Sequence, residues 1–147
     1  MTMQASTLVF PMFAMVLLTA GVLAILFRSR VRAVRAGELS ASFFRTFQGG
    51  PEPDYAVKPA RHFTNLFEAP TLFYAACLTA MVTGVADPAM NALAWCYVVA
   101  RLAHAYIHLG ANRVRYRIRA YFASWLVLVA MWMYLAGHVA ARGLAAG

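Results

Sequence analysis

The sequence has little charge for its 147 residues, and acidic side chains are the scarcest of all. Charged residues make up 12% of the chain, whereas soluble domains typically carry about 25%. Five Asp and Glu stand against 13 Lys and Arg. Such a shortage argues against an ordinary soluble domain, even though the length would suit one.

Cysteine is also rare, and the first apolar stretch does not have the pattern of a signal peptide. The two cysteines, Cys77 and Cys96, lie within apolar stretches and show no CxxC spacing. This favours small packing residues over a disulfide or a thiol site. The first apolar stretch has no basic segment before it and is too long for a signal peptide, so we expect it to be a retained helix.

Long apolar runs dominate what is present. The chain is 63% hydrophobic, with a mean hydropathy of +0.63. A bilayer core of roughly 30 Å needs about 20 apolar residues per helix. Four runs meet this need: Leu8–Phe27, Leu66–Val85, Met90–Leu109 and Ala120–Val139. We therefore predict an all-α integral membrane protein, a four-transmembrane-helix bundle that forms a single domain over residues 1–147.

The net charge of +8 is distributed unevenly. Seven of the 13 basic residues lie in or beside the segment 28–60, and four more lie at 113–119. By the positive-inside rule both segments are cytoplasmic and both termini are outside. Because nucleic-acid binding would not explain the apolar bulk, we expect membrane lipids and no nucleic acid as partners. We expect a bacterial inner membrane, or the endoplasmic reticulum of a eukaryote.

Polar residues in the apolar runs share narrow helical faces. One face of the third run carries Tyr97, Arg101, His104, His108 and Asn112. Arginine inside a span is costly and normally points into a bundle. The second helix, expected to begin near Pro59–Ala60, aligns Arg61, Asn65 and Glu68. We therefore expect Glu68 to pair with Arg101.

Depth along antiparallel helices predicts where these faces meet. At 1.5 Å per residue, Glu68 lies about 12 Å from the start of its helix, and His104 lies about 12 Å from the end of its own. Pro70 should kink the second helix beside them. Arg117 and Tyr121 at the start of the fourth helix would close a basic cavity that opens toward the cytoplasm.

Several alternatives compete with a ligand site. An isolated Glu68–Arg101 pair could merely fix helix register. His104 and His108 at i, i+4 could bind a metal, but no HExxH motif or further carboxylate supports one, so we expect none. Haem between one of these histidines and His62 or His138 is disfavoured by Arg101 on the same face.

Charge indicates what the cavity would bind. One carboxylate against at least two arginines favours a small anionic ligand. A molecule with two carboxylates and one ammonium group would match both signs, and glutathione is one such molecule. Its thiol would be activated by an arginine that stabilises the thiolate. The residues alone do not select glutathione from other zwitterions.

These motifs resemble those of the MAPEG family, the membrane-associated proteins in eicosanoid and glutathione metabolism. The resemblance rests on two spaced motifs and on the basic run before the fourth helix. They are Arg61-x-x-x-Asn65-x-x-Glu68, Arg101-x-x-His104-x-x-x-His108, and Arg113–Arg119 leading to Tyr121. Two departures stand out, because His108 replaces a tyrosine of well-known members and Pro70 follows Glu68 closely.

The resemblance implies a homotrimer that binds glutathione near the cytoplasmic side and admits lipophilic small molecules from the bilayer. Glutathione, as cosubstrate, would be held by Arg61, Asn65, Glu68, Arg101, His104, His108 and Tyr121. Arg117, or else Arg113, would stabilise the thiolate. The implied activity is that of a glutathione transferase or peroxidase in detoxification. Two alternatives stay open: a small proton-coupled transporter that uses Glu68, and a non-catalytic scaffold of the same fold.

Overall fold

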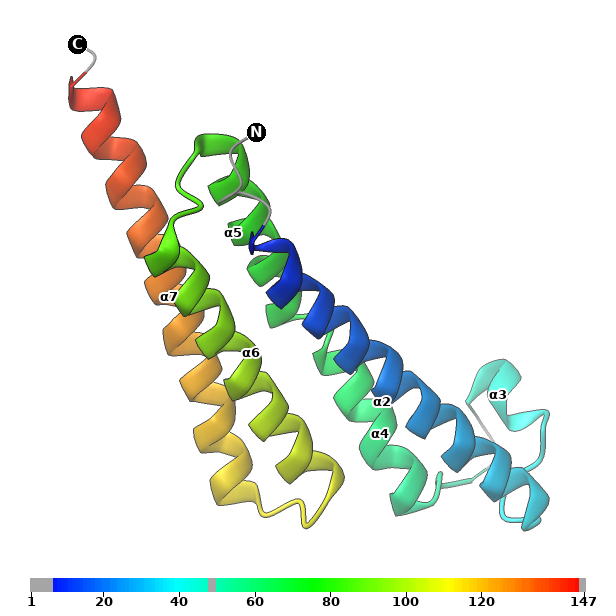
Figure 1. Ribbon diagram of the computed structural model, residues 1–147. Coiled ribbons are helices and arrows are strands. Elements are labelled where there is room, and N and C mark those ends of the chain that lie inside the picture. Colours follow the sequence, from blue (N-terminus) through cyan, green and yellow to red (C-terminus); the bar gives the residue numbers. More distant parts are fainter. Residues whose placement is uncertain (1–6, 48–49, 146–147) are drawn as a thin grey trace.

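The computed structural model describes residues 7–47 and 50–145, and this part of the chain contains helices and no strand (Figure 1). Four long helical segments account for most of it, and the second of them is interrupted. The helices are α2 (Val9–Arg35), α3 (Phe43–Thr46), α4 (Asp54–Asn65), α5 (Ala69–Thr83), α6 (Pro88–Leu109) and α7 (Val114–Ala145).

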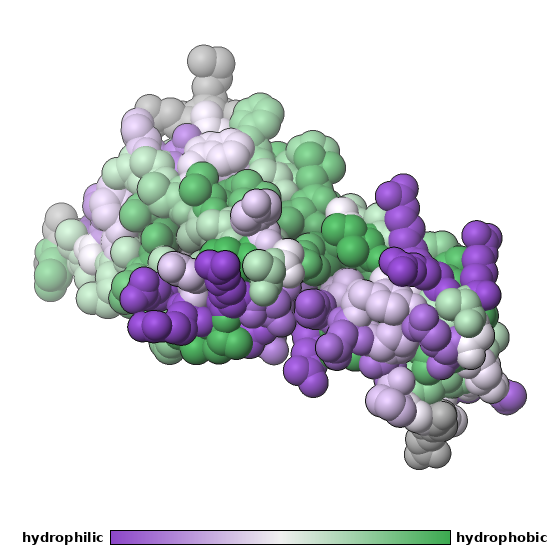
Figure 2. Space-filling model, turned by 90° about the horizontal axis from the view of Figure 1, so that it is seen from below, coloured by the Kyte–Doolittle hydropathy of each residue, from purple (hydrophilic) through white to green (hydrophobic). Residues whose placement is uncertain are grey.

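The helices run up and down in one bundle. Helices α6 and α7 lie antiparallel along much of their length, and α2 lies beside α4 (Figure 1). The start of α2 and the end of α7 lie toward the end that holds the α5–α6 turn, whereas the end of α2, the start of α4 and the α6–α7 turn lie at the other. Seen from that other end, hydrophilic side chains gather in patches (Figure 2). The basic segments therefore share one end, as the charge pattern predicts.

Among the residues that the structure describes, three helical segments are long and apolar enough to cross a membrane. They are Val9–Arg35, Asp54–Thr83 and Val114–Leu144. Large apolar side chains face outward on them, such as Phe27 at 67% exposure and Leu126 at 72%. An integral membrane protein is therefore indicated. The third predicted span coincides with α6, whose polar face lowers its hydropathy, and its crossing of the membrane stays a prediction.

The start of the second helix differs from the prediction. Helix α4 begins at Asp54 rather than near Pro59–Ala60, so Pro59 lies inside the helix. The negative charge of Asp54 in the first turn interacts favourably with the positive end of the helix dipole. Ala56 and Pro59 are buried, and α4 packs against α2. This packing offsets the missing N–H of Pro59, and the predicted loop 28–60 is correspondingly shorter.

Pro70 is predicted to kink the second helix, and in the structure the helix is interrupted just before it. The chain leaves helical geometry at residues 66–68, between α4 and α5. Glu68 precedes α5 with φ −88° and ψ −96°, and Pro70 stands in the first turn of the new helix. A proline cannot donate an N–H to the preceding turn, and its ring clashes with the carbonyl four residues earlier, which here is that of Leu66. The kink is thus a complete interruption beside the polar residues.

The connection between α2 and α4 is fastened to α2. Arg30 Nε donates to Glu52 Oε1 at 3.2 Å, and Tyr55 Oη donates to Glu38 Oε2 at 2.6 Å. The Arg32 guanidinium lies 4.8 Å from the centre of the Tyr55 ring. This segment therefore covers the end of α2 and supplies no wall to the cavity described below.

The bundle core is apolar toward the α5–α6 turn. The rings of Phe73 and Tyr97 stack at 4.5 Å between centroids, and both are fully buried. Cys77 lies in the same core, whereas Cys96 is exposed, and both are free thiols. Arg101 lies one helical turn beyond Tyr97, where the polar side chains begin.

The α5–α6 turn is closed by Asp87, which caps α6. Asp87 Oδ1 accepts from the Met90 backbone N–H at 2.8 Å, and its other oxygen accepts from the Tyr134 hydroxyl of α7. Burial raises the pKa of this carboxyl, but the hydrogen bonds from Met90 and Tyr134 outweigh it and leave the pKa below its usual value. The ionised form of Asp87 therefore ties α6 to α7.

Replacing Asp87 by alanine should destabilise the protein by about 0.5–2 kcal/mol, the usual cost of a lost N-cap. The lowered pKa means that this carboxylate stabilises the fold above the unfolded pKa of about 3.9 and stops doing so as pH falls through its folded value. In thermal unfolding in detergent, the wild type should melt at a higher temperature than Asp87→Ala at neutral pH, and this difference should shrink on acidification. A difference in melting temperature that does not change with pH would contradict a stabilising role for the charge of Asp87.

Candidate functional site

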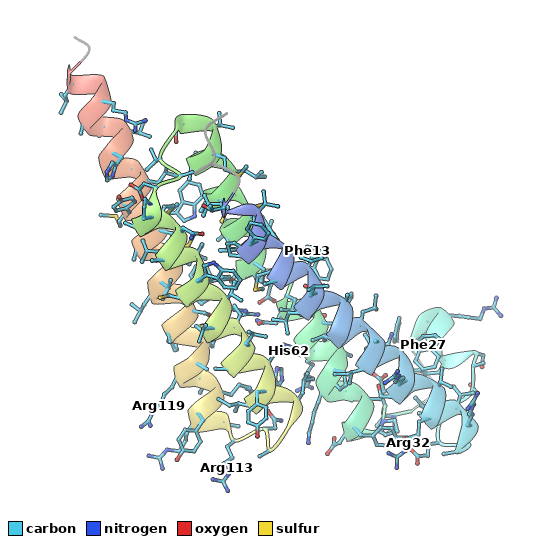
Figure 3. All side chains as sticks on the ribbon, in the orientation of Figure 1. Phe13, Phe27, Arg32, His62, Arg113 and Arg119 are labelled. Carbon is cyan, nitrogen blue, oxygen red and sulfur yellow. The ribbon has the colours of Figure 1, made fainter. Side chains whose placement is uncertain are left out.

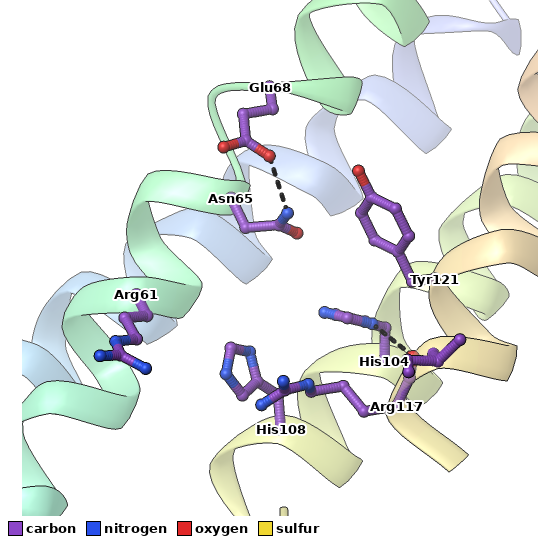
Figure 4. A pocket seen from close by; sticks show the side chains of 8 residues that line it. Arg61, Asn65, Glu68, His104, His108, Arg117 and Tyr121 are labelled. Atoms are coloured by element: carbon purple, nitrogen blue, oxygen red, sulfur yellow. Dashed lines mark hydrogen bonds between the residues drawn. The ribbon is translucent and has the colours of Figure 1, made fainter. Parts of the chain in front are cut away.

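A cavity of about 340 Å³ lies where α4, the break after it, α6 and α7 meet (Figure 4). Six of its lining side chains carry charge or a hydrogen-bonding ring or amide, and a tyrosine and an isoleucine complete it. The lining residues are Arg61, Asn65, Glu68, His104, His108, Arg117, Ile118 and Tyr121. The antiparallel packing of α4 against α6 thus brings together the two polar faces that the sequence predicts.

Asn65 links the acid and the base that we expected to pair directly. Its Nδ2 donates to Glu68 Oε2 at 2.9 Å, and its Oδ1 accepts from Arg101 Nη2 at 2.6 Å. No Glu68–Arg101 ion pair forms in the structure, so the expected direct contact is wrong. The helix break explains the difference, because it turns Glu68 away from α6 and toward the cavity (Figure 4).

Arg101 lies beneath the cavity instead of in its wall. It is 0% exposed, and its Nε and Nη1 have no hydrogen-bond partner among the described residues. Asn65 supplies both of its contacts, through Oδ1 and more weakly through the backbone oxygen at 3.5 Å. A buried cation held mainly by one amide depends strongly on that amide.

Arg117 is held at the mouth of the cavity from two sides. Its Nη1 donates to Asn112 Oδ1 at 2.7 Å, and its backbone oxygen lies 3.3 Å from His104 Nδ1. Asn112 has a φ of 48°, which turns the chain sharply between α6 and α7. Tyr121, one turn along α7, lies 5.7 Å from the His104 ring between centroids. The turn therefore aims the first side chains of α7 at the polar face of α6.

The other thiolate-stabilising residue that we considered, Arg113, lies elsewhere. It is exposed and lines a separate hollow with Tyr106 and Tyr116. Arg113 points away from the bundle, as does Arg119 (Figure 3). Within one chain, only Arg117 of these three arginines borders the cavity.

His62 is a buried member of the polar cluster that sequence reasoning considered only as a haem ligand. Its Nδ1 lies 3.0 Å from His108 Nδ1, and its ring stacks on His104 with centroids 5.3 Å apart. Its position in the sequence does contain a signal. His62 lies three residues before Asn65, so the two side chains occupy neighbouring positions on α4.

The cavity is lined by cationic, hydrogen-bonding and acidic groups from different helices. The guanidinium groups of Arg61 and Arg117 each carry about five N–H donors. Glu68 provides the single carboxylate of the lining. Such a site suits a small ligand with carboxylates and an ammonium group, and a guanidinium can stabilise a thiolate.

Comparison with known protein families identifies the family of the chain. The MAPEG family profile matches residues 8–137, which include every residue that lines the cavity. A search of curated proteins found no match. The match extends over nearly the whole chain, from the beginning of α2 to the outer part of α7, and this integral membrane protein therefore belongs to the MAPEG family.

Proposed function

We propose that the protein is a glutathione-dependent transferase or peroxidase that acts on lipophilic electrophiles. The observation that carries this proposal is the cavity, in which Arg61, Arg117 and Glu68 border one space. Its charges complement the two carboxylates and the ammonium group of glutathione. Membership of a family that includes glutathione-dependent enzymes supports the same reading.

Each part of the ligand has a matching group in the wall. Arg61, about one helical turn after Lys58 on α4, would bind a carboxylate, and Asn65 and Glu68 would bind the amino end. Arg101 acts through Asn65, whose amide it holds in place. In this arrangement Arg101 positions a ligand-binding group.

The remaining groups surround the thiol. Arg117 would stabilise the thiolate, which attacks the electrophilic carbon or oxygen of the second substrate. His104, His108 and Tyr121 border the same space and would orient the ligand. Outward-facing apolar side chains on α2 and α7 would contact lipid or neighbouring chains in a homotrimer, and lipophilic substrate would arrive from the bilayer.

Glutathione binding tests the proposal directly. Saturating glutathione should raise the melting temperature of detergent-purified protein, because a ligand of the folded state stabilises it. Glu68→Gln should weaken the apparent affinity by about tenfold, the usual effect of losing a partly exposed charge-assisted contact. Glu38→Gln is the matched control, since Glu38 contacts Tyr55 away from the cavity.

The same variants separate the proposal from proton-coupled transport. A transporter that uses Glu68 for coupling would lose proton dependence in Glu68→Gln and would show no saturable glutathione shift. No shift at millimolar glutathione in the wild type would overturn the glutathione proposal. If glutathione does bind, conjugation and peroxidase assays with hydrophobic substrates would distinguish the transferase reaction from the peroxidase reaction.

A further inference from the structure

Three histidines converge at the inner edge of the cavity. His62 comes from α4, and His104 and His108 come from α6. All three are buried, and one ring nitrogen of each lies within 4.8 Å of the other two. The His62 and His108 Nδ1 atoms are 3.0 Å apart. Two nitrogens bound to one tetrahedral zinc at 2.0–2.1 Å lie about 3.3 Å apart, so small side-chain rotations would bring all three into range.

Hydrogen bonding within the cluster leaves a polar atom unsatisfied. His62 is 0% exposed, and its Nε2 has no partner among the described residues. Either tautomer of the His62–His108 contact leaves that nitrogen without a partner. Buried polar atoms are nearly always satisfied in folded proteins, so the His62–His108 contact alone does not account for the burial of this ring.

His104 is already oriented as a metal ligand would be. Its Nδ1 lies 3.3 Å from the backbone oxygen of Arg117, which can only accept a hydrogen bond. The contact places the proton on Nδ1 and leaves the Nε2 lone pair available. Metal-binding histidines characteristically donate their second ring N–H to a carbonyl or carboxylate in this way.

On this basis we infer that His62, His104 and His108 form a binding site for a transition-metal ion of the zinc type. A set of three imidazoles without a carboxylate suits zinc, copper, nickel or iron rather than magnesium or calcium. This revises the expectation that the chain binds no metal. That expectation rested on the absence of a sequence motif, whereas the third ligand comes from another helix.

The surrounding charge determines the fourth ligand. Arg61 and Arg117 border the cavity and oppose a bare divalent cation. An anion such as hydroxide or a thiolate in the fourth position would reduce this repulsion and would itself contact the arginines. His104 and His108 line the cavity, so the fourth position of the ion would face it. The site needs no glutathione to form, although His104 and His108 also border the space that we propose for glutathione.

Cobalt binding tests the inference, with protein purified without a polyhistidine tag and without glutathione. One Co²⁺ per chain should bind, give visible bands typical of four-coordinate cobalt, and be displaced by Zn²⁺. His62→Ala should weaken Co²⁺ binding by at least about 100-fold, since a ligand is removed. His138→Ala is the control, because the fourth histidine contacts Tyr134 at the other end of α7.

A second variant protects the test against misfolding. His62→Cys should keep Co²⁺ and add a sulfur-to-cobalt charge-transfer band, which an unfolded chain would not produce. Wild-type protein that binds no Co²⁺, or His62→Ala protein that binds as tightly as wild type, would overturn the inference. Either result leaves the glutathione proposal standing, because the rise in melting temperature with glutathione is a separate measurement made without added metal.

Discussion

Replacing Arg117 by alanine should lower the rate of glutathione conjugation at neutral pH by about 10- to 100-fold. A guanidinium that lowers a thiol pKa by one or two units contributes about 1.4–2.8 kcal/mol to thiolate formation. Arg117 borders the cavity and is held there through Asn112. Alanine leaves the backbone oxygen that faces His104 in place, so the cavity wall should keep its shape.

The pH profile identifies the cause of this loss. Without Arg117 the thiol should ionise near its ordinary pKa of about 8.5, so the rate deficit should be full at neutral pH and shrink above about pH 9. Arg113→Ala is the matched control, since Arg113 is exposed and borders a different hollow. A deficit that persists at high pH, or one that appears in Arg113→Ala instead, would contradict the assignment of Arg117.

The polar faces were predictable because helical spacing is local. Residues three and four apart share a face, and this alone places Arg101, His104 and His108 together and aligns Arg61 with Asn65. Antiparallel packing then brings the two faces to one depth. The chain's basic segments likewise gather at one end, as the charge pattern indicates.

The expected pairing of Glu68 with Arg101 failed for a reason that spacing does not contain. The interruption between α4 and α5 removes Glu68 from the face that it would occupy on a continuous helix. Pro70 signals a kink, but the direction of the chain after residue 65 depends on packing across the bundle. An amide, Asn65, consequently stands between the two charges.

The histidine cluster also depends on tertiary structure. His104 and His108 are one turn apart on α6, whereas His62 reaches them from α4, 46 residues away from His108 in sequence. A motif search requires ligands at short fixed spacing and finds only the pair. That the His62 ring joins this pair can be recognised only when the rotation of α4 about its own axis is known.

Replacing Asn65 by leucine should destabilise the folded protein by about 3–5 kcal/mol, the usual cost of leaving a buried charge uncompensated. Asn65 Oδ1 is the closest acceptor for the Arg101 guanidinium, and two of that group's nitrogens already lack partners. Thermal or denaturant unfolding in detergent would measure the loss. Thr64→Ala is the matched control, because Thr64 is exposed and its hydroxyl donates to the backbone oxygen of Ala60 in its own helix.

A double-mutant cycle separates loss of this contact from general disruption of α4. If the cost arises from the unpaired Arg101, the variant with both Asn65→Leu and Arg101→Met should recover much of the lost stability, since it buries no orphaned cation. Additive losses in the double variant would instead mean that the two side chains stabilise the bundle separately. The recovered double variant should still fail to bind glutathione, because the amide that holds Glu68 toward the cavity is gone. Stability and binding would then depend on Asn65 through different contacts, one beneath the cavity and one within it.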